Sequence, residues 1–107
     1  MKETAYIVVL ITTETDEEAQ QISALLLEKK LAACVNIVPG VKSLFRWENK
    51  VESAQESLLV VKSRQDRLPL IIDMVKTNHS AAVPEIIALP VIGGHRDYLD
   101  WIDESLG

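Results

Sequence analysis

The sequence of 107 residues contains a single cysteine, Cys34. A disulfide within one chain needs two cysteines, and a zinc site made from cysteines alone needs more, so both are excluded. Stable disulfides are typical of oxidising compartments, and a chain without one fits the reducing cytoplasm. We therefore expect a cytoplasmic protein.

The sequence also lacks a long apolar run. A helix that crosses a membrane needs about 20 consecutive apolar residues, and the longest runs here, such as Tyr6–Ile11, are far shorter. No basic segment followed by an apolar stretch stands at the start, so we expect no signal peptide. These features predict a protein that does not enter a membrane.

Positive charge is scarce. Lys and Arg number 11 against 16 Asp and Glu, which gives a formal net charge of −5. Nucleic-acid-binding domains usually carry a basic surface, and anionic lipid surfaces attract basic segments. The acidic balance therefore argues against nucleic acid and against an anionic membrane as partners.

Recognisable catalytic motifs are missing as well. The sequence has no HExxH, CxxC or GxSxG pattern, and Gly93-Gly94 is not followed by the Lys-Ser/Thr of a phosphate-binding loop. The two histidines and the one cysteine are dispersed, so their spacing supports neither a Ser-His-Asp nor a Cys-His pair. We expect no enzymatic reaction, and we interpret His95 as a solvated loop histidine.

What is present is a globular composition. Hydrophobic residues make up 48% of the chain and charged residues 25%, proportions that are typical of folded domains. A chain of this length suits one domain, so we expect residues 1–107 to fold as a single unit.

Hydrophobic periodicity predicts both strands and helices. Ala5–Thr12 is a continuous β-branched run of the kind that is buried on both faces of a sheet. Leu68, Ile71, Ile72 and Val75 recur at the spacing of one helix face. The predicted elements are a strand over 5–12, a helix over 15–30, a strand from 33 into a long hairpin that turns at 48–50 and returns through 63, a helix over 66–78, a strand over 85–92 and a short helix around 98–102.

This order is the split βαβ, or ferredoxin-like, pattern of an α+β fold. It predicts a four-stranded antiparallel sheet covered on one face by two helices, with a short C-terminal helix. Pro39-Gly40 within the second strand predicts a bulge or an edge position. The second apolar face of 5–12 and the long hairpin Val41–Val51 need cover from outside one domain, and both predict self-association.

Several stretches together carry a family resemblance. They are KLAACVNIVPGVKSLFRWENKVE (Lys30–Glu52), ESLLVVKS (Glu56–Ser63), VPEIIALPV (Val83–Val91) and YLDWI (Tyr98–Ile102), and the opening VVLITTETDEEAQQIS fits as well. The chain resembles the CutA family of divalent-cation-tolerance proteins over nearly its whole length.

The resemblance implies the ferredoxin-like fold and a tight homotrimer, similar in shape to the PII signalling proteins, with clefts between subunits. It implies a role in tolerance to copper and other divalent metals, without a defined reaction. Two alternatives belong to other classes. One is a small-metabolite sensor or enzyme that acts in the intersubunit cleft, and the other is a structural trimer whose outer surface binds a partner.

The resemblance also implies which residues line the intersubunit cleft: Trp47, Lys62, His79 and Glu85. The family commonly reads His-Pro-Tyr where this chain reads His79-Ser80-Ala81. Some members carry a further histidine and a cysteine where Asn78 and Ile11 stand here. His79 is therefore a weak candidate metal ligand, and no cofactor is expected beyond copper or another divalent cation held weakly.

Each of these side chains also has a plainer interpretation. His79 follows a helix end, where the helix dipole favours a cation. Trp47 suits packing between subunits or stacking on a ligand. Lys62 and Glu85, like Glu56, fit either the cleft or an ordinary ion pair at a strand end. Cys34 lies in an apolar strand without a neighbouring His or Arg, which favours core packing.

Overall fold

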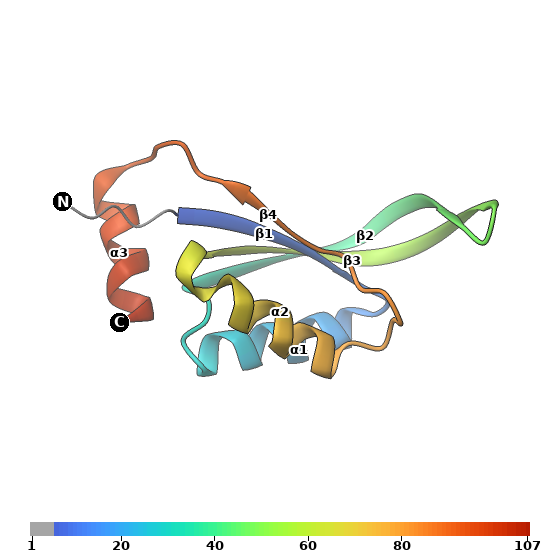
Figure 1. The fold of residues 1–107 in the computed structure, drawn as a ribbon, viewed down its shortest axis with the longest axis horizontal. Helices are drawn as coiled ribbons and strands as arrows, with labels where there is room; N and C mark the ends of the chain where they lie inside the picture. The colour runs from blue at the N-terminus through green and yellow to red at the C-terminus, as the bar shows by residue number, and fades with distance from the viewer. Residues whose placement is uncertain (1–5) are drawn as a thin grey trace.

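The computed structural model describes residues 6–107 (Figure 1). The elements in chain order are β1 (Tyr6–Thr13), α1 (Asp16–Glu28), β2 (Cys34–Trp47), β3 (Lys50–Arg64), a 3-10 turn (Gln65–Arg67), α2 (Leu68–Asn78), β4 (Ile86–Pro90) and α3 (Arg96–Leu106). None of the α-helices in this described range is long and apolar enough to cross a membrane.

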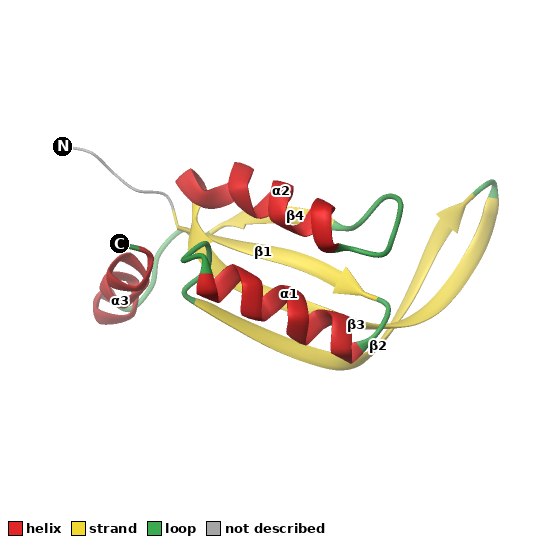
Figure 2. Cartoon of the chain, turned by 90° about the horizontal axis from the view of Figure 1, so that it is seen from below, coloured by secondary structure: helices red, strands yellow, loops and turns green. Residues whose placement is uncertain are grey.

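The strands form one antiparallel sheet in the order β2-β3-β1-β4. Figure 2 shows α1 and α2 side by side on one face of this sheet. The strand order, the antiparallel pairing and the single helical layer confirm the predicted ferredoxin-like fold. The fold places the ends of β1 and α2 near the base of the β2–β3 hairpin, where the candidate site lies.

Local sequence explains where the two covering helices begin and end. Thr15 caps α1, because its Oγ1 accepts a hydrogen bond of 3.1 Å from the Glu18 backbone N–H. Three acidic residues follow in the first turn, where the helix dipole favours negative charge. Pro69 stands in the first turn of α2, where its missing N–H costs no helical hydrogen bond. The predicted helix limits agree with the structure to within two residues.

The hairpin of β2 and β3 extends well beyond the helical layer (Figure 2). Its turn consists of Glu48 and Asn49, which have positive φ angles of 51° and 64° and join the paired residues Trp47 and Lys50. The pairing register shifts between Val38 and Val41, so β2 carries the predicted bulge and is also an edge strand. Because of the hairpin, the chain measures 48 × 26 × 23 Å.

The core lies between the helices and one face of the sheet. Side chains at alternate positions of β1 and β3 are fully or almost fully buried against apolar residues of α1 and α2. The largest fully buried side chains are Ile11, Ile22, Leu26, Leu59 and Ile71. All five lie within elements predicted from the sequence, and Ile71 belongs to the helix face that the periodicity predicted.

Within the single chain, β1 is buried on one face only. Ile7, Val9 and Ile11 are buried, whereas the alternating Val8 and Leu10 are only half-buried. Both crossover helices lie on the same side of the sheet, since such connections are almost always right-handed. The opposite face of the sheet therefore keeps apolar side chains that, along most of its length, none of the helices in residues 6–107 covers.

We call this surface the open face. Its apolar residues follow from the register, because directly paired residues point to the same side of a sheet. Leu10 pairs with Val60 and Ile87, and Val8 pairs with Leu89. Ile87 and Leu89 are 53% and 47% exposed. An apolar patch of this kind usually marks an interaction surface.

The C-terminal helix α3 covers one end of the open face (Figure 1). Leu99, Ile102 and Leu106 are buried there against Tyr6 and Ala33. The helix is therefore longer than the short one predicted around 98–102. Tyr98 and Trp101, which lie in the predicted range, are exposed, and their ring centroids are 5.5 Å apart.

A polar network fixes α3 to the sheet and predicts an acid dependence. The Tyr6 hydroxyl donates a hydrogen bond of 2.6 Å to Asp103, and the Arg64 guanidinium lies 3.0 Å from the same carboxylate. The hydrogen bond from Tyr6 and then the charge of Arg64 hold the pKa of Asp103 below its ordinary value of 3.8. A carboxyl group with a lowered pKa stabilises the fold above its unfolded-state pKa, and this contribution is lost as the pH falls through the folded-state pKa.

The Asp103→Asn variant should therefore lose stability at neutral pH and lose less than the unmodified protein on acidification. We expect the urea midpoint of the variant to change less between about pH 4 and pH 2. Asp97→Asn is the control, because that carboxylate is 88% exposed. Equal acid dependence in the protein and in both variants would contradict the role given to Asp103.

Candidate functional site

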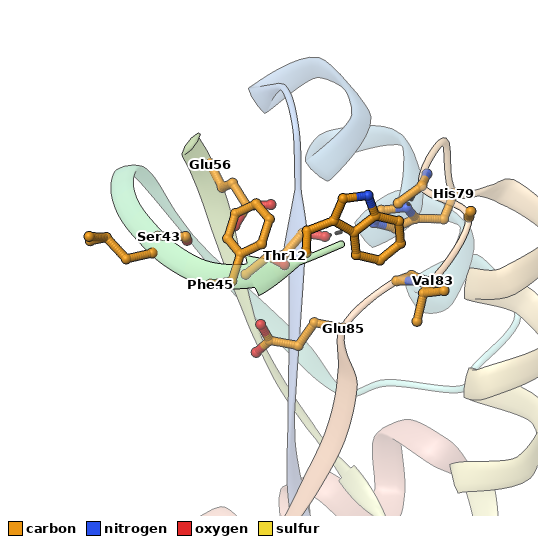
Figure 3. A pocket seen from close by; sticks show the side chains of 12 residues that line it. Thr12, Ser43, Phe45, Glu56, His79, Val83 and Glu85 are labelled. Atoms are coloured by element: carbon orange, nitrogen blue, oxygen red, sulfur yellow. Dashed lines mark hydrogen bonds between the residues drawn. The ribbon is translucent and has the colours of Figure 1, made fainter. Parts of the chain in front are cut away.

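A cavity of about 670 Å³ lies beside the base of the hairpin. Its wall comes from the end of β1, from the β2–β3 hairpin, and from the segment that joins α2 to β4. Figure 3 shows Phe45 and Glu56 of the hairpin on one side, with His79 and Val83 of the joining segment on the other. Volumes of 300–1,000 Å³ are typical of pockets for small molecules.

His79 lies in the cavity wall with its side chain only 4% exposed. Its Nε2 is 2.7 Å from the Thr12 carbonyl oxygen, and the Ala81 backbone N–H donates to its Nδ1 at 3.0 Å. The neutral ring protonated at Nε2 satisfies both contacts, because Nε2–H then donates and Nδ1 accepts. In this arrangement neither ring nitrogen has a free lone pair for a metal ion.

The loop after α2 is held by a second contact as well. Glu18 in the first turn of α1 accepts hydrogen bonds from the Ser80 backbone N–H at 2.7 Å and from the Ser80 hydroxyl at 3.2 Å. The His79 Nδ1 lies 4.0 Å from the same carboxylate. His79 and Glu18 therefore fix the loop against both β1 and α1, which positions the wall of the cavity.

These supporting residues were not predicted from the sequence. In the sequence Glu18 is one of three acidic residues at the start of a helix, and Thr12 acts through its backbone carbonyl, which carries no residue-specific signal. Ser80 lies 62 positions from Glu18. Only the packing of α1 beside the α2–β4 segment brings them together.

Three of the four predicted cleft residues line this cavity, namely Trp47, His79 and Glu85, and Glu56 joins them. Trp47 is 47% exposed in the single chain. Glu56 is half-buried and Glu85 is exposed. The fold therefore brings these three predicted residues together at one place.

Lys62 is not part of the cavity wall. It pairs with Val8 and Cys34 across the sheet, and its ammonium group donates to the Asn36 side chain. The same ammonium lies 3.8 Å from the Cys34 sulfur. Cys34 is only half-buried, so its interpretation as a core residue without a neighbouring cation was wrong. Strand pairing supplies a lysine that is 28 residues away in the sequence.

Tyr98 of α3 also lies close to this cysteine. Burial, and then the neighbouring Cys34, raise the pKa of the Tyr98 phenol above its usual value of 10.0. His95, the other histidine, has a side chain that is 76% exposed, as expected for a loop residue. Neither feature extends the cavity.

Within residues 6–107, no three His, Cys, Asp or Glu side chains lie close enough together to hold a metal ion. Tight sites for transition metals need several ligands in a set geometry. A single chain thus offers a partly apolar cavity with two carboxylates and a fully hydrogen-bonded histidine.

The sequence of this chain matches the CutA1 divalent ion tolerance protein family over residues 7–105. The chain belongs to the CutA1 family. A CutA protein of Thermus thermophilus, named as a divalent-cation tolerance protein, is 49% identical over 94% of this chain and 97% of its own length. The recognition made from the hairpin and Pro-Glu motifs is thereby confirmed.

Solved CutA structures also share the fold. The periplasmic divalent cation tolerance protein CutA from Archaeoglobus fulgidus superposes with a TM-score of 0.93 at 46% identity, over 95% of this chain and 99% of that one. The chloroplastic CutA protein of Arabidopsis thaliana is 46% identical over 92% of this chain, which spans 54% of the plant protein's length. The CutA fold therefore accounts for nearly all of this chain.

Proposed function

We propose that this chain works as a homotrimer in the cellular response to divalent metal ions such as copper, without catalysing a reaction. Membership of the CutA1 family supports the link to divalent cations. The low cysteine content supports a cytoplasmic location. The proposal of a trimer rests on one observation, the apolar open face of the sheet.

The open face supports self-association on physical grounds. Its central residues Leu10, Val60 and Ile87 form one cross-strand row, and they are not part of the core that the described helices form with the sheet. Burial of apolar surface contributes about 25 cal/mol per Å², so covering this sheet face with another subunit is energetically favourable. Copies of the same chain are always available, and closed symmetric assemblies are the usual result.

Sedimentation velocity of the purified protein tests the assembly directly. We expect one species with three times the chain mass of 11.9 kDa at micromolar concentration. A folded monomer at that concentration would exclude the trimer.

Copper titration tests how the metal response relates to His79. Because both ring nitrogens are engaged within the chain, we expect Cu²⁺ to bind with a dissociation constant of about 1 μM or weaker. His79→Ala should leave this weak binding largely unchanged where the variant remains folded. Sub-nanomolar binding that disappears in the variant would identify His79 as a true ligand.

A second function is favoured by the cavity. Its volume suits a small metabolite, so the chain is alternatively a sensor of a small molecule bound where subunits meet. Thr12 and Glu56 lie on the side of the open face, which would bring this cavity close to the subunit boundary. Mass analysis of protein purified under native conditions should then detect a bound compound.

A further inference from the structure

The charged side chains of the cavity wall are of one sign, and this favours some classes of ligand over others. Glu56 and Glu85 contribute two carboxylates, and the wall residues among 6–107 include neither Lys nor Arg. Within residues 6–107, neither carboxylate makes an ion pair or a side-chain hydrogen bond. Helix α2 also ends at Asn78, next to the wall, and a helix C-terminus carries partial negative charge.

The same wall carries two aromatic rings, Phe45 and Trp47, which are 42% and 47% exposed. Aromatic faces attract ammonium and guanidinium groups through their quadrupole, and Trp does so most strongly. In Figure 3, Phe45 comes from the same hairpin as Glu56 and is drawn beside its carboxylate, with Glu85 entering from the opposite segment. Apolar contact, aromatic faces and negative charge are therefore present together.

We propose that this cavity binds a small organic cation, an amine or a guanidinium compound with an apolar body. The carboxylates would attract the charged group, the rings would contact both the charge and the apolar part, and Val83 and Pro84 would add apolar wall. A nucleotide or another phosphate compound is disfavoured, because the described wall residues offer no cation to it. A bare metal ion is disfavoured, since no set of three ligands is present among the described residues.

The inference deepens the small-molecule alternative above and does not rest on the response to metal ions. The hairpin and the α2–β4 segment of one chain already form the cavity. A failed amine titration would leave the trimer mass and the copper titration unaffected, so the two proposals fail separately.

Isothermal titration calorimetry of the full chain with three matched probes tests the proposal. The probes are 2-phenylethylammonium, neutral 2-phenylethanol and anionic 3-phenylpropionate, which share a phenyl ring on a short chain. We expect the ammonium to bind at least about tenfold more tightly than the alcohol, and the carboxylate to bind more weakly than both. The double variant Glu56→Gln/Glu85→Gln should weaken ammonium binding by about tenfold and leave the alcohol nearly unchanged.

Glu28→Gln/Glu104→Gln is the matched control. It also removes two carboxylate charges, but from exposed sites on α1 and α3 that are not part of the cavity wall. It should therefore retain ammonium binding. Equal or tighter binding of the carboxylate, no saturable ammonium binding, or binding that survives Glu56→Gln/Glu85→Gln would overturn the proposal. Saturable Cu²⁺ binding that this variant abolishes, without ammonium binding, would also overturn it and make the cavity a metal site.

Discussion

Val60→Asp is expected to convert the proposed trimer into monomers. Val60 lies on the central strand β3, between Leu10 of β1 and Asn36 of β2, and its side chain points to the open face. In the single chain it is half-buried, so a carboxylate there can reach water as long as no subunit covers it. Assembly would bury that charge without a partner, which costs several kcal/mol.

Sedimentation velocity at micromolar concentration measures this outcome, and circular dichroism shows whether the variant is still folded. Leu70→Asp is the matched control, because Leu70 is 54% exposed on α2, in the helical layer on the other side of the sheet. The control should retain the trimer mass. A trimeric Val60→Asp variant, or dissociation caused by Leu70→Asp, would show that the subunits do not meet on the open face.

Replacement of His79 by alanine is expected to lower the free energy of unfolding by about 2–4 kcal/mol, through polar groups left without partners. The Thr12 carbonyl would lose the donor at 2.7 Å, and the Ala81 N–H would lose its acceptor. The imidazole is nearly completely buried, so its removal also leaves a void in the wall of the cavity. This effect is independent of any metal.

Urea unfolding monitored by circular dichroism gives the size of the effect. His95→Ala is the matched control, since it deletes a histidine whose side chain is 76% exposed, and it should change stability by less than about 0.5 kcal/mol. Similar effects of the two substitutions would mean that His79 does not hold the loop. A loss confined to His79→Ala, with unchanged copper binding, would identify this histidine as a structural residue.

The ends and faces of the elements were largely predictable because they depend on local chemistry. The cap at Thr15, the Pro69 position and the bulge at Pro39-Gly40 all follow from what neighbouring backbone groups require. The continuous β-branched run in 5–12 identified the strand but not its exposure. Whether its second face is covered depends on which side the crossover helices take, and the sequence pattern of one strand contains no information on that.

The site was predictable only in part. Trp47, His79 and Glu85 were chosen from motifs and do meet in one cavity. Lys62 was chosen in the same way, yet the strand register places it beside Cys34 and Asn36. Lys62 points to the open face near the start of β1, whereas the cavity lies at the other end of that strand, so position along the sheet separates residues that a motif alone would group together.

By itself, the sequence determined the α+β class, the order of the elements and the CutA1 family, because these depend on periodicity and on short motifs. Only the tertiary structure decided that His79 uses both ring nitrogens on Thr12 and Ala81, that Lys62 approaches Cys34, and that Glu56 and Glu85 share a cavity whose described wall residues include no lysine or arginine. Each of these contacts joins residues far apart in the chain or uses backbone atoms. Their positions follow from the register and packing of the whole sheet, and no local pattern of side chains specifies them.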